Sequence, residues 1–197
     1  MGLKEWRLRV KEYNAIATTG PIIRRYFVIG AFDGALTILG LILGASAAGV
    51  TTPQADLGRL VILTGLAATV GLTVSSGVGA YEAERVERRL DLHSLERAML
   101  RQMGESHGGA FAYAAWISAL VHGVSPMVAA IPPLLPFVFL PFPQAVAVAI
   151  VIALGLLFVM GAFLGRLVKE RFLATGFRFV LAGLVTAIIL YVVGRLV

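Results

Sequence analysis

The sequence predicts an all-α fold, a polytopic membrane protein with five transmembrane helices, its N-terminus in the cytoplasm and its C-terminus outside. Composition is the first reason: 58% of the 197 residues are apolar and only 14% are charged, and the mean hydropathy is +0.88, more than a soluble domain requires. The second reason is that apolar runs long enough to cross a bilayer occur at residues 26–49, 57–80, 110–131, 144–165 and 177–196.

The basic residues are the third reason and predict the orientation. Of the 17 lysines and arginines, all but Arg59 and Arg195 fall before the first apolar run, between the second and third, or between the fourth run and the first residues of the fifth. The positive-inside rule places these three segments in the cytoplasm. The net charge of +6 therefore follows the topology, and we expect no nucleic acid as a partner.

Residues 1–20 are predicted to form an interfacial amphipathic helix ahead of the membrane domain at 21–197. Apolar side chains, Trp6 and Tyr13 among them, share one helical face, and we expect Gly20-Pro21 to end this helix. The first apolar run starts near residue 26 and lacks a convincing cleavage site, so we expect it to act as its own insertion signal. Because no organellar targeting segment is apparent, a prokaryotic plasma membrane is favoured.

Asp33 is the most informative residue, because it lies seven residues into the first apolar run. At about 1.5 Å of rise per residue, its carboxylate would sit roughly 10 Å below the start of that helix, too deep to reach headgroup water. A charge in hydrocarbon is costly and persists mainly for a function, so Asp33 suggests cation handling. The alternative is a structural carboxyl that stays protonated or hydrogen-bonds to Thr37.

Small and polar residues recur at helical spacing in the first two spans. In the first span they form one stripe: Gly30, Asp33, Thr37, Gly40, Gly44 and Ala47. In the second span they repeat every fourth residue: Ala67, Gly71, Ser75 and Gly79. Such spacing lets helix backbones approach closely, although ordinary helix packing would produce it as well.

The second span is predicted to continue as a helix past the membrane, because residues 81–103 contain neither Gly nor Pro. Residues 81–109 would then be a short cytoplasmic helical extension. Its acidic residues, Glu84 and Glu87 among them, could collect divalent cations through carboxylate oxygens. The interleaved arginines favour a solvated, self-paired helix surface instead.

In the third span, His122 is either a metal ligand or proton carrier, or a hydrogen-bonding packing residue. Pro126 interrupts the span, and residues 131–143 hold five prolines. Since proline removes a helical hydrogen bond, we predict a kinked helix end followed by an outer loop there.

Two kinds of chemistry have no support in the sequence. The chain has no cysteine, which excludes disulfides and thiolate metal sites. It also contains none of the HExxH, Gly-Lys-Ser/Thr or DxDxDG motifs. We therefore do not expect an enzyme, and we expect no bound cofactor.

Three motifs give the chain a resemblance to a known family. The first span contains Asp33-Gly34 followed by Leu-x-x-Leu-Gly, the second ends in Ser75-Ser-Gly-Val-Gly-Ala-Tyr-Glu-Ala-Glu-Arg, and the third is followed by Ile131-Pro-Pro-Leu-Leu-Pro. In this order, and over nearly all of residues 22–197, they resemble the vacuolar iron transporter family, which includes the yeast Ca(2+)-sensitive cross-complementer and plant nodulin-like iron carriers.

The resemblance implies a homodimer of five-helix protomers that exports cytosolic Fe(II) or Mn(II) in exchange for protons, along a path near the dimer axis. Asp33 is the family metal-site residue that carries over. Ser76 stands where the family has a methionine, and Ala80 stands where it has the glutamate of a Glu-Tyr pair. The cytoplasmic insertion, a carboxylate-rich metal-binding domain in some members, is short here.

We therefore predict a divalent transition-metal transporter whose partners are the metal ion, protons, the lipid bilayer and a second copy of itself. The candidate metal-binding residues are Asp33, Thr37, Ser76, Glu84, Glu87 and His122. Leucine at Gly34 or Gly44 is expected to lower the dimer fraction. A passive cation channel and a non-transporting membrane assembly protein are the alternatives.

Overall fold

The computed structural model describes residues 3–48, 54–100 and 105–196, and every element in these ranges is a helix. Five helices are long and apolar enough to cross a membrane. They are α2 (Thr19–Ala48), α3 (Gln54–Met99), α4 (Glu105–Leu134), α6 (Phe142–Leu167) and α7 (Phe172–Leu196). A further helix, α1 (Leu3–Ala17), precedes them, and the short α5 (Pro136–Phe139) joins α4 to α6. The predicted all-α, five-span fold class is confirmed.

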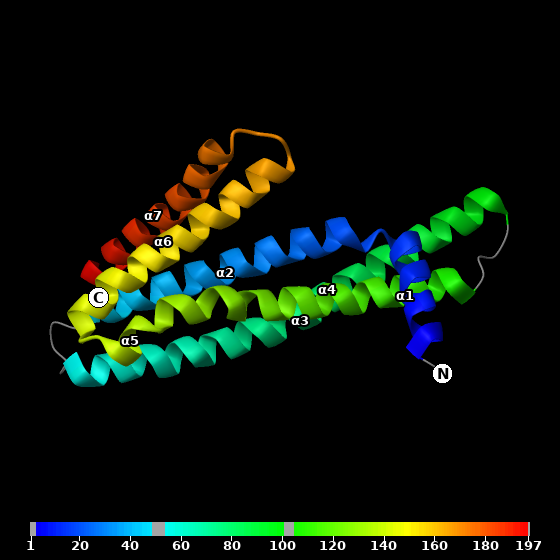
Figure 1. Ribbon diagram of the computed structural model, residues 1–197. Helices are drawn as coiled ribbons and strands as arrows, with labels where there is room; N and C mark the ends of the chain where they lie inside the picture. The colour runs from blue at the N-terminus through cyan, green and yellow to red at the C-terminus, as the bar shows by residue number, and fades with distance from the viewer. Residues whose placement is uncertain (1–2, 49–53, 101–104, 197) are drawn as a thin grey trace.

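The helices α2, α3 and α4 run along the long axis of the molecule, and α6 and α7 form a hairpin that meets them at one end (Figure 1). The hairpin then diverges from α2, and an apolar cleft of about 390 Å³ opens between α2 and α6. The two chain ends lie toward opposite ends of the bundle (Figure 1). Which end faces the cytoplasm stays a prediction.

Close backbone contacts place α4 between α2 and α3. A Cβ atom at Gly34 of α2 would lie 2.7 Å from the Cα atom of Pro126, and one at Gly123 of α4 would lie 3.1 Å from the carbonyl oxygen of Thr73 on α3. Only small residues allow such approach. Gly34 is therefore buried against α4 of its own chain, whereas Gly44 has no described atom within 4 Å of its added Cβ. The expectation that leucine at either position lowers the dimer fraction stays a prediction.

The helix α4 continues through Pro126, Pro132 and Pro133, so the kinked end and outer loop predicted over residues 131–143 are wrong for most of that segment. Proline lacks the N–H that would reach the carbonyl four residues earlier. At Pro126 that carbonyl belongs to His122, and the hydroxyl of Ser125 donates to it at 3.1 Å. A neighbouring side chain thus replaces the missing donor, and the helix is not interrupted.

The junction between α1 and α2 also differs from the prediction. Thr18 has a left-handed φ of 49° and separates the two helices, so Gly20 and Pro21 lie in the first turn of α2. Proline is tolerated there because the first N–H groups of a helix have no helical acceptor. The hydroxyl of Thr19 donates to the side-chain oxygen of Asn14 across the junction.

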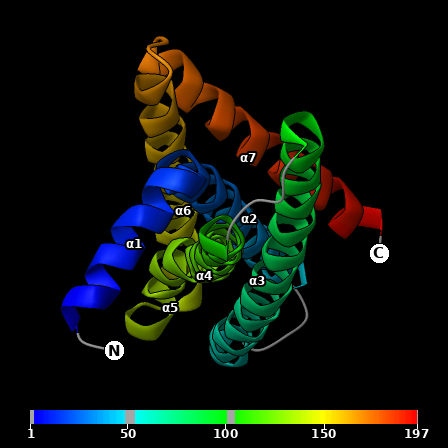
Figure 2. The same cartoon turned by 90° about the vertical axis from the view of Figure 1, so that its right-hand side faces the viewer.

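Two further arrangements position the site. α1 runs across α4 and not along it (Figures 1 and 2), with the rings of Tyr13 and Tyr113 at a centroid distance of 6.0 Å. α3 is a single helix of 46 residues, and its C-terminal part projects past the start of α2 (Figure 1).

Candidate functional site

Asp33 lies at the middle of the first membrane helix, because it is the fifteenth of the 30 residues of α2. Its side chain is partly exposed. Within the part of the chain that the structure describes, no residue forms a hydrogen bond or ion pair with its carboxylate, Thr37 included. The alternative in which Thr37 holds a structural carboxyl therefore has no support from this geometry.

The exposed part of the Asp33 side chain must still have a neighbour outside the chain. Hydrocarbon is the costly choice, at about 3 kcal/mol or more for a charged side chain at the bilayer centre. Water in a cavity or a second protein surface avoids that cost. The position of Asp33 therefore requires either an aqueous path or a covering partner at this depth.

His122 of α4 is held to α2 by a backbone carbonyl. Its Nδ1 atom lies 3.0 Å from the carbonyl oxygen of Tyr26, and since a carbonyl can only accept, Nδ1 carries the hydrogen and Nε2 keeps its lone pair. A Cβ atom at Gly30 would lie 2.9 Å from this Nδ1, so glycine makes the contact possible. Backbone carbonyls orient metal-ligating histidines in the same way, so the geometry suits a ligand as well as a packing residue.

Glu84 of α3 is only 4% exposed and is fully engaged. Its carboxylate accepts from Arg88 Nε at 2.8 Å, from the Tyr26 hydroxyl at 3.2 Å and from Arg25 at 3.5 Å. Arg88 also donates to the carbonyl of Ala17 at 3.5 Å. This cluster ties α1, α2 and α3 together, and a metal ion could bind Glu84 only by displacing at least one of these donors.

The remaining candidates differ in exposure. Thr37 of α2 and Ser76 of α3 are partly buried, while Glu87 of α3 is exposed. Among the residues that the structure describes, no three His, Asp or Glu side chains gather as a metal site. The role of these candidates therefore stays a prediction.

Sequence reasoning missed the connecting residue, Tyr26. Its hydroxyl reaches Glu84 and its carbonyl reaches His122, and its ring lies 5.2 Å from the imidazole, centroid to centroid. The signal in the sequence that could have identified Tyr26 is its position four residues before Gly30, on the same face of α2.

In the part of the chain that the structure describes, the hydroxyl of Thr73 is buried without a hydrogen-bond partner.

Fold and site together define a five-span integral membrane protein with an unpaired carboxylate at the middle of its first span. The model of the VIT family, the vacuolar iron transporters, matches residues 24–105 and 85–195. The chain belongs to that family, whose members are membrane metal transporters and not enzymes. An uncharacterised protein of Methanocaldococcus jannaschii is 29% identical over 175 residues, which cover 87% of this chain and 88% of the relative.

Proposed function

We propose that this protein exports Fe(II) or Mn(II) from the cytosol in exchange for protons, as a homodimer in a prokaryotic plasma membrane. The observation that carries the proposal is the unpaired, partly exposed carboxylate of Asp33 at the middle of α2. A divalent cation gives that carboxylate the counter-charge which the chain itself does not provide. Membership of the VIT family supports metal as the cargo, and the archaeal relative supports a prokaryotic membrane.

The exposure of Asp33 supports the proposed dimer. A second copy related by a two-fold axis would cover the carboxylate and add another one, so that two Asp33 side chains face each other. Two neighbouring carboxylates hold one shared proton, because ionisation of the first disfavours ionisation of the second. A divalent cation would displace this proton, and reprotonation from outside would release the metal.

Other side chains would complete the coordination. Thr37 lies one turn from Asp33 and offers a hydroxyl oxygen, and Ser76 offers another from α3. The Nε2 atom of His122 would be a nitrogen ligand of a kind that suits iron. Glu87, exposed on α3, would attract cations at the mouth of the path, and Glu84 would join it only after releasing an arginine.

Metal uptake into proteoliposomes tests this function and separates it from the two alternatives. The purified protein would be reconstituted in vesicles, and Mn(II) or Fe(II) entry would be measured with and without a pH gradient. Antiport predicts that an outward proton gradient drives the metal inward above its equilibrium level. Equal rates with and without the gradient would indicate a passive channel, and no uptake in either case would indicate an assembly protein.

A further inference from the structure

A cleft of about 310 Å³ lies between α3 and α4, away from Asp33, and is lined by three arginines. Arg85, Arg88 and Arg89 form one of its walls together with Tyr81 and Leu92, and Phe111 of α4 faces them. The five α3 residues recur at helical spacing, so this stripe of α3 presents three guanidinium groups and no carboxylate. Such a wall is complementary to an anion.

The three arginines are not equally available. Arg88 is held by Glu84, and its guanidinium carbon lies 5.6 Å from the centre of the Phe111 ring. Arg85 pairs at 3.2 Å with Glu82, and both of these side chains are about half exposed. Arg89 has no ion pair within the described part of the chain. Arg89 is therefore free to bind, and Arg85 can exchange its exposed, solvent-screened pair with Glu82 for another anion, while Arg88 and Phe111 form a fixed floor.

Aromatic residues beside the cleft indicate that it lies near the depth of lipid headgroups. Tyr81 packs on Trp116 at a centroid distance of 5.0 Å, and Trp116 is 59% exposed, as is typical of the aromatic residues at a membrane boundary. Arg85 and Arg89 follow Tyr81 by about one and two helical turns, roughly 6 and 12 Å along α3. A headgroup layer extends about 5–8 Å beyond the hydrocarbon, so both side chains can reach phosphate level.

We propose that this cleft binds the phosphate of an anionic phospholipid, between the guanidinium groups of Arg85 and Arg89. Arginine binds phosphate oxygens in pairs, with two parallel hydrogen bonds. Basic pockets between membrane helices are a recurring form of lipid headgroup site. The apolar side of the cleft, Leu92 and Phe111, would contact the glycerol and the upper part of an acyl chain.

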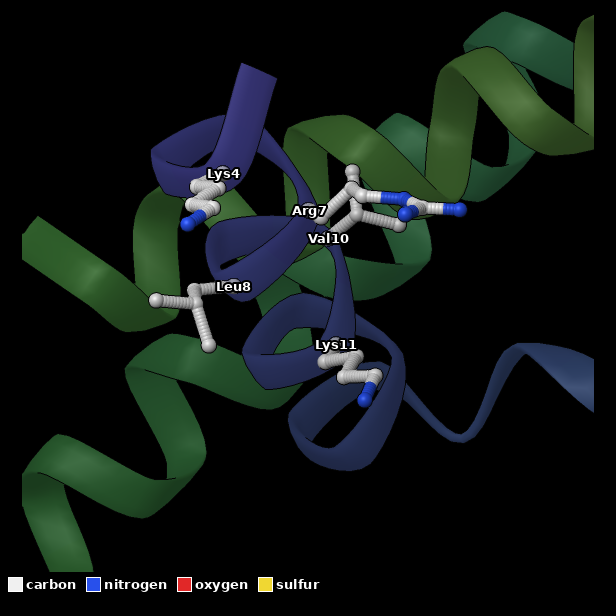
Figure 3. A pocket seen from close by; sticks show the side chains of 5 residues that line it. All are labelled: Lys4, Arg7, Leu8, Val10 and Lys11. Carbon is white, nitrogen blue, oxygen red and sulfur yellow. The ribbon is translucent and has the colours of Figure 1, made fainter. Parts of the chain in front are cut away.

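A second basic surface provides the control. The side chains of Lys4, Arg7, Leu8, Val10 and Lys11 line a hollow of about 630 Å³ on α1, and all project from that single helix (Figure 3). Its cations belong to the same predicted membrane face, but no aromatic side chain is among these five. Removing two positive charges here changes the bulk electrostatics as much as removing two from the cleft.

The test is thermal unfolding of the full chain in neutral detergent, titrated with dioleoyl-phosphatidylglycerol and, as reference, with dioleoyl-phosphatidylcholine. We expect only the anionic lipid to raise the melting temperature of wild type. Arg85→Gln with Arg89→Gln should weaken its apparent affinity by at least about tenfold, because the variant loses charge-assisted hydrogen bonds to the phosphate as well as charge. Lys4→Gln with Lys11→Gln should change the affinity by less than about threefold. Arg85→Lys with Arg89→Lys should recover only part of the affinity that the glutamine variant loses, because lysine restores the charge but not the paired hydrogen bonds.

Three results would overturn the proposal. Equal losses in the cleft variant and the α1 variant would mean that only bulk charge matters. Undiminished lipid binding in the cleft variant would remove the site. Stabilisation of wild type by inorganic phosphate that matches that of the lipid would mean that the ligand is a soluble phosphate.

Discussion

Glu84 and Asp33 are both carboxylates on membrane helices, yet the chain treats them in opposite ways. Glu84, near the end of the apolar part of α3, is 4% exposed and accepts hydrogen bonds from Arg25, Arg88 and Tyr26. Asp33, at the middle of α2, has no partner among the described residues. A carboxylate that is neutralised inside its own chain stabilises the fold, whereas one without an internal partner is open to a counter-charge from outside the chain, which we propose is the transported cation.

The largest expected effect is on transport, and it belongs to Asp33 alone. Asp33→Asn keeps the side-chain volume but removes the charge. Loss of a residue that only supports a metal ligand lowers metal affinity or activity by about 10–100-fold. We expect loss of the ligand itself to lower uptake by on the order of 100-fold or more. The free energy of unfolding should change by less than about 0.5 kcal/mol, because no partner is lost. Uptake by the variant at the wild-type rate would place the cation elsewhere.

Next in size is a pair of glycine substitutions that separates folding from assembly. Gly34→Leu should destabilise the protomer by about 3 kcal/mol or more, since its Cβ would meet the backbone of Pro126. Gly44→Leu, whose Cβ meets no described atom within 4 Å, should leave the protomer folded and lower the dimer fraction. Thermal unfolding and light scattering in detergent measure the two properties, and a folded Gly34→Leu dimer would contradict the packing of α2 on α4.

At Glu84 we expect a loss of stability, where at Asp33 we expect a loss of transport. Glu84→Gln should lower the free energy of unfolding by about 1–3 kcal/mol, because two arginines lose a buried counter-charge. The matched control is Glu82→Gln, which breaks an exposed pair with Arg85 and should cost less than about 0.5 kcal/mol. Equal stability of the two variants, measured by chemical denaturation in detergent, would remove the structural role assigned to Glu84.

The smallest effect concerns selectivity at Ser76. Hydroxyl and carboxylate oxygens suit Mn(II), whereas a thioether sulfur favours softer metals. We expect Ser76→Met to shift preference from Mn(II) toward Fe(II) by a few-fold in competition uptake assays at fixed total metal. An unchanged preference would show that position 76 does not contact the ion.

The fold class followed from sequence because hydrocarbon admits few structures. Five long apolar runs with few charges have to be helices, since only a helix satisfies its backbone hydrogen bonds within one segment. The prolines of α4 led to a wrong prediction, because the Ser125 hydroxyl supplies the hydrogen-bond donor that Pro126 lacks. A single side-chain hydrogen bond of this kind produces no periodic pattern in the sequence, so the pattern could not predict it. At the junction of α1 and α2, Pro21 begins a helix where it was expected to end one.

For the site, the sequence identified the carboxylates but not their surroundings. The sequence alone does not show that Glu84 accepts a hydrogen bond from Arg25, which lies 59 positions earlier in the chain. It also does not show that Tyr26 contacts both Glu84 and His122. These contacts depend on how closely Gly30 and Gly34 let α2 approach α4. Asp33 was recognisable because its surroundings are apolar whichever helices are its neighbours.

The central claim is that the transported cation binds the carboxylate of Asp33. Anomalous diffraction from crystals of the wild-type protein soaked in Mn(II) tests it most directly, with Asp33→Asn crystals as the matched control. We expect an anomalous peak within coordination distance of the Asp33 carboxylate, on the axis between two protomers, and no peak there in the variant. A peak at Glu84 or Glu87 with none at Asp33, or an unchanged peak in the variant, would contradict the account.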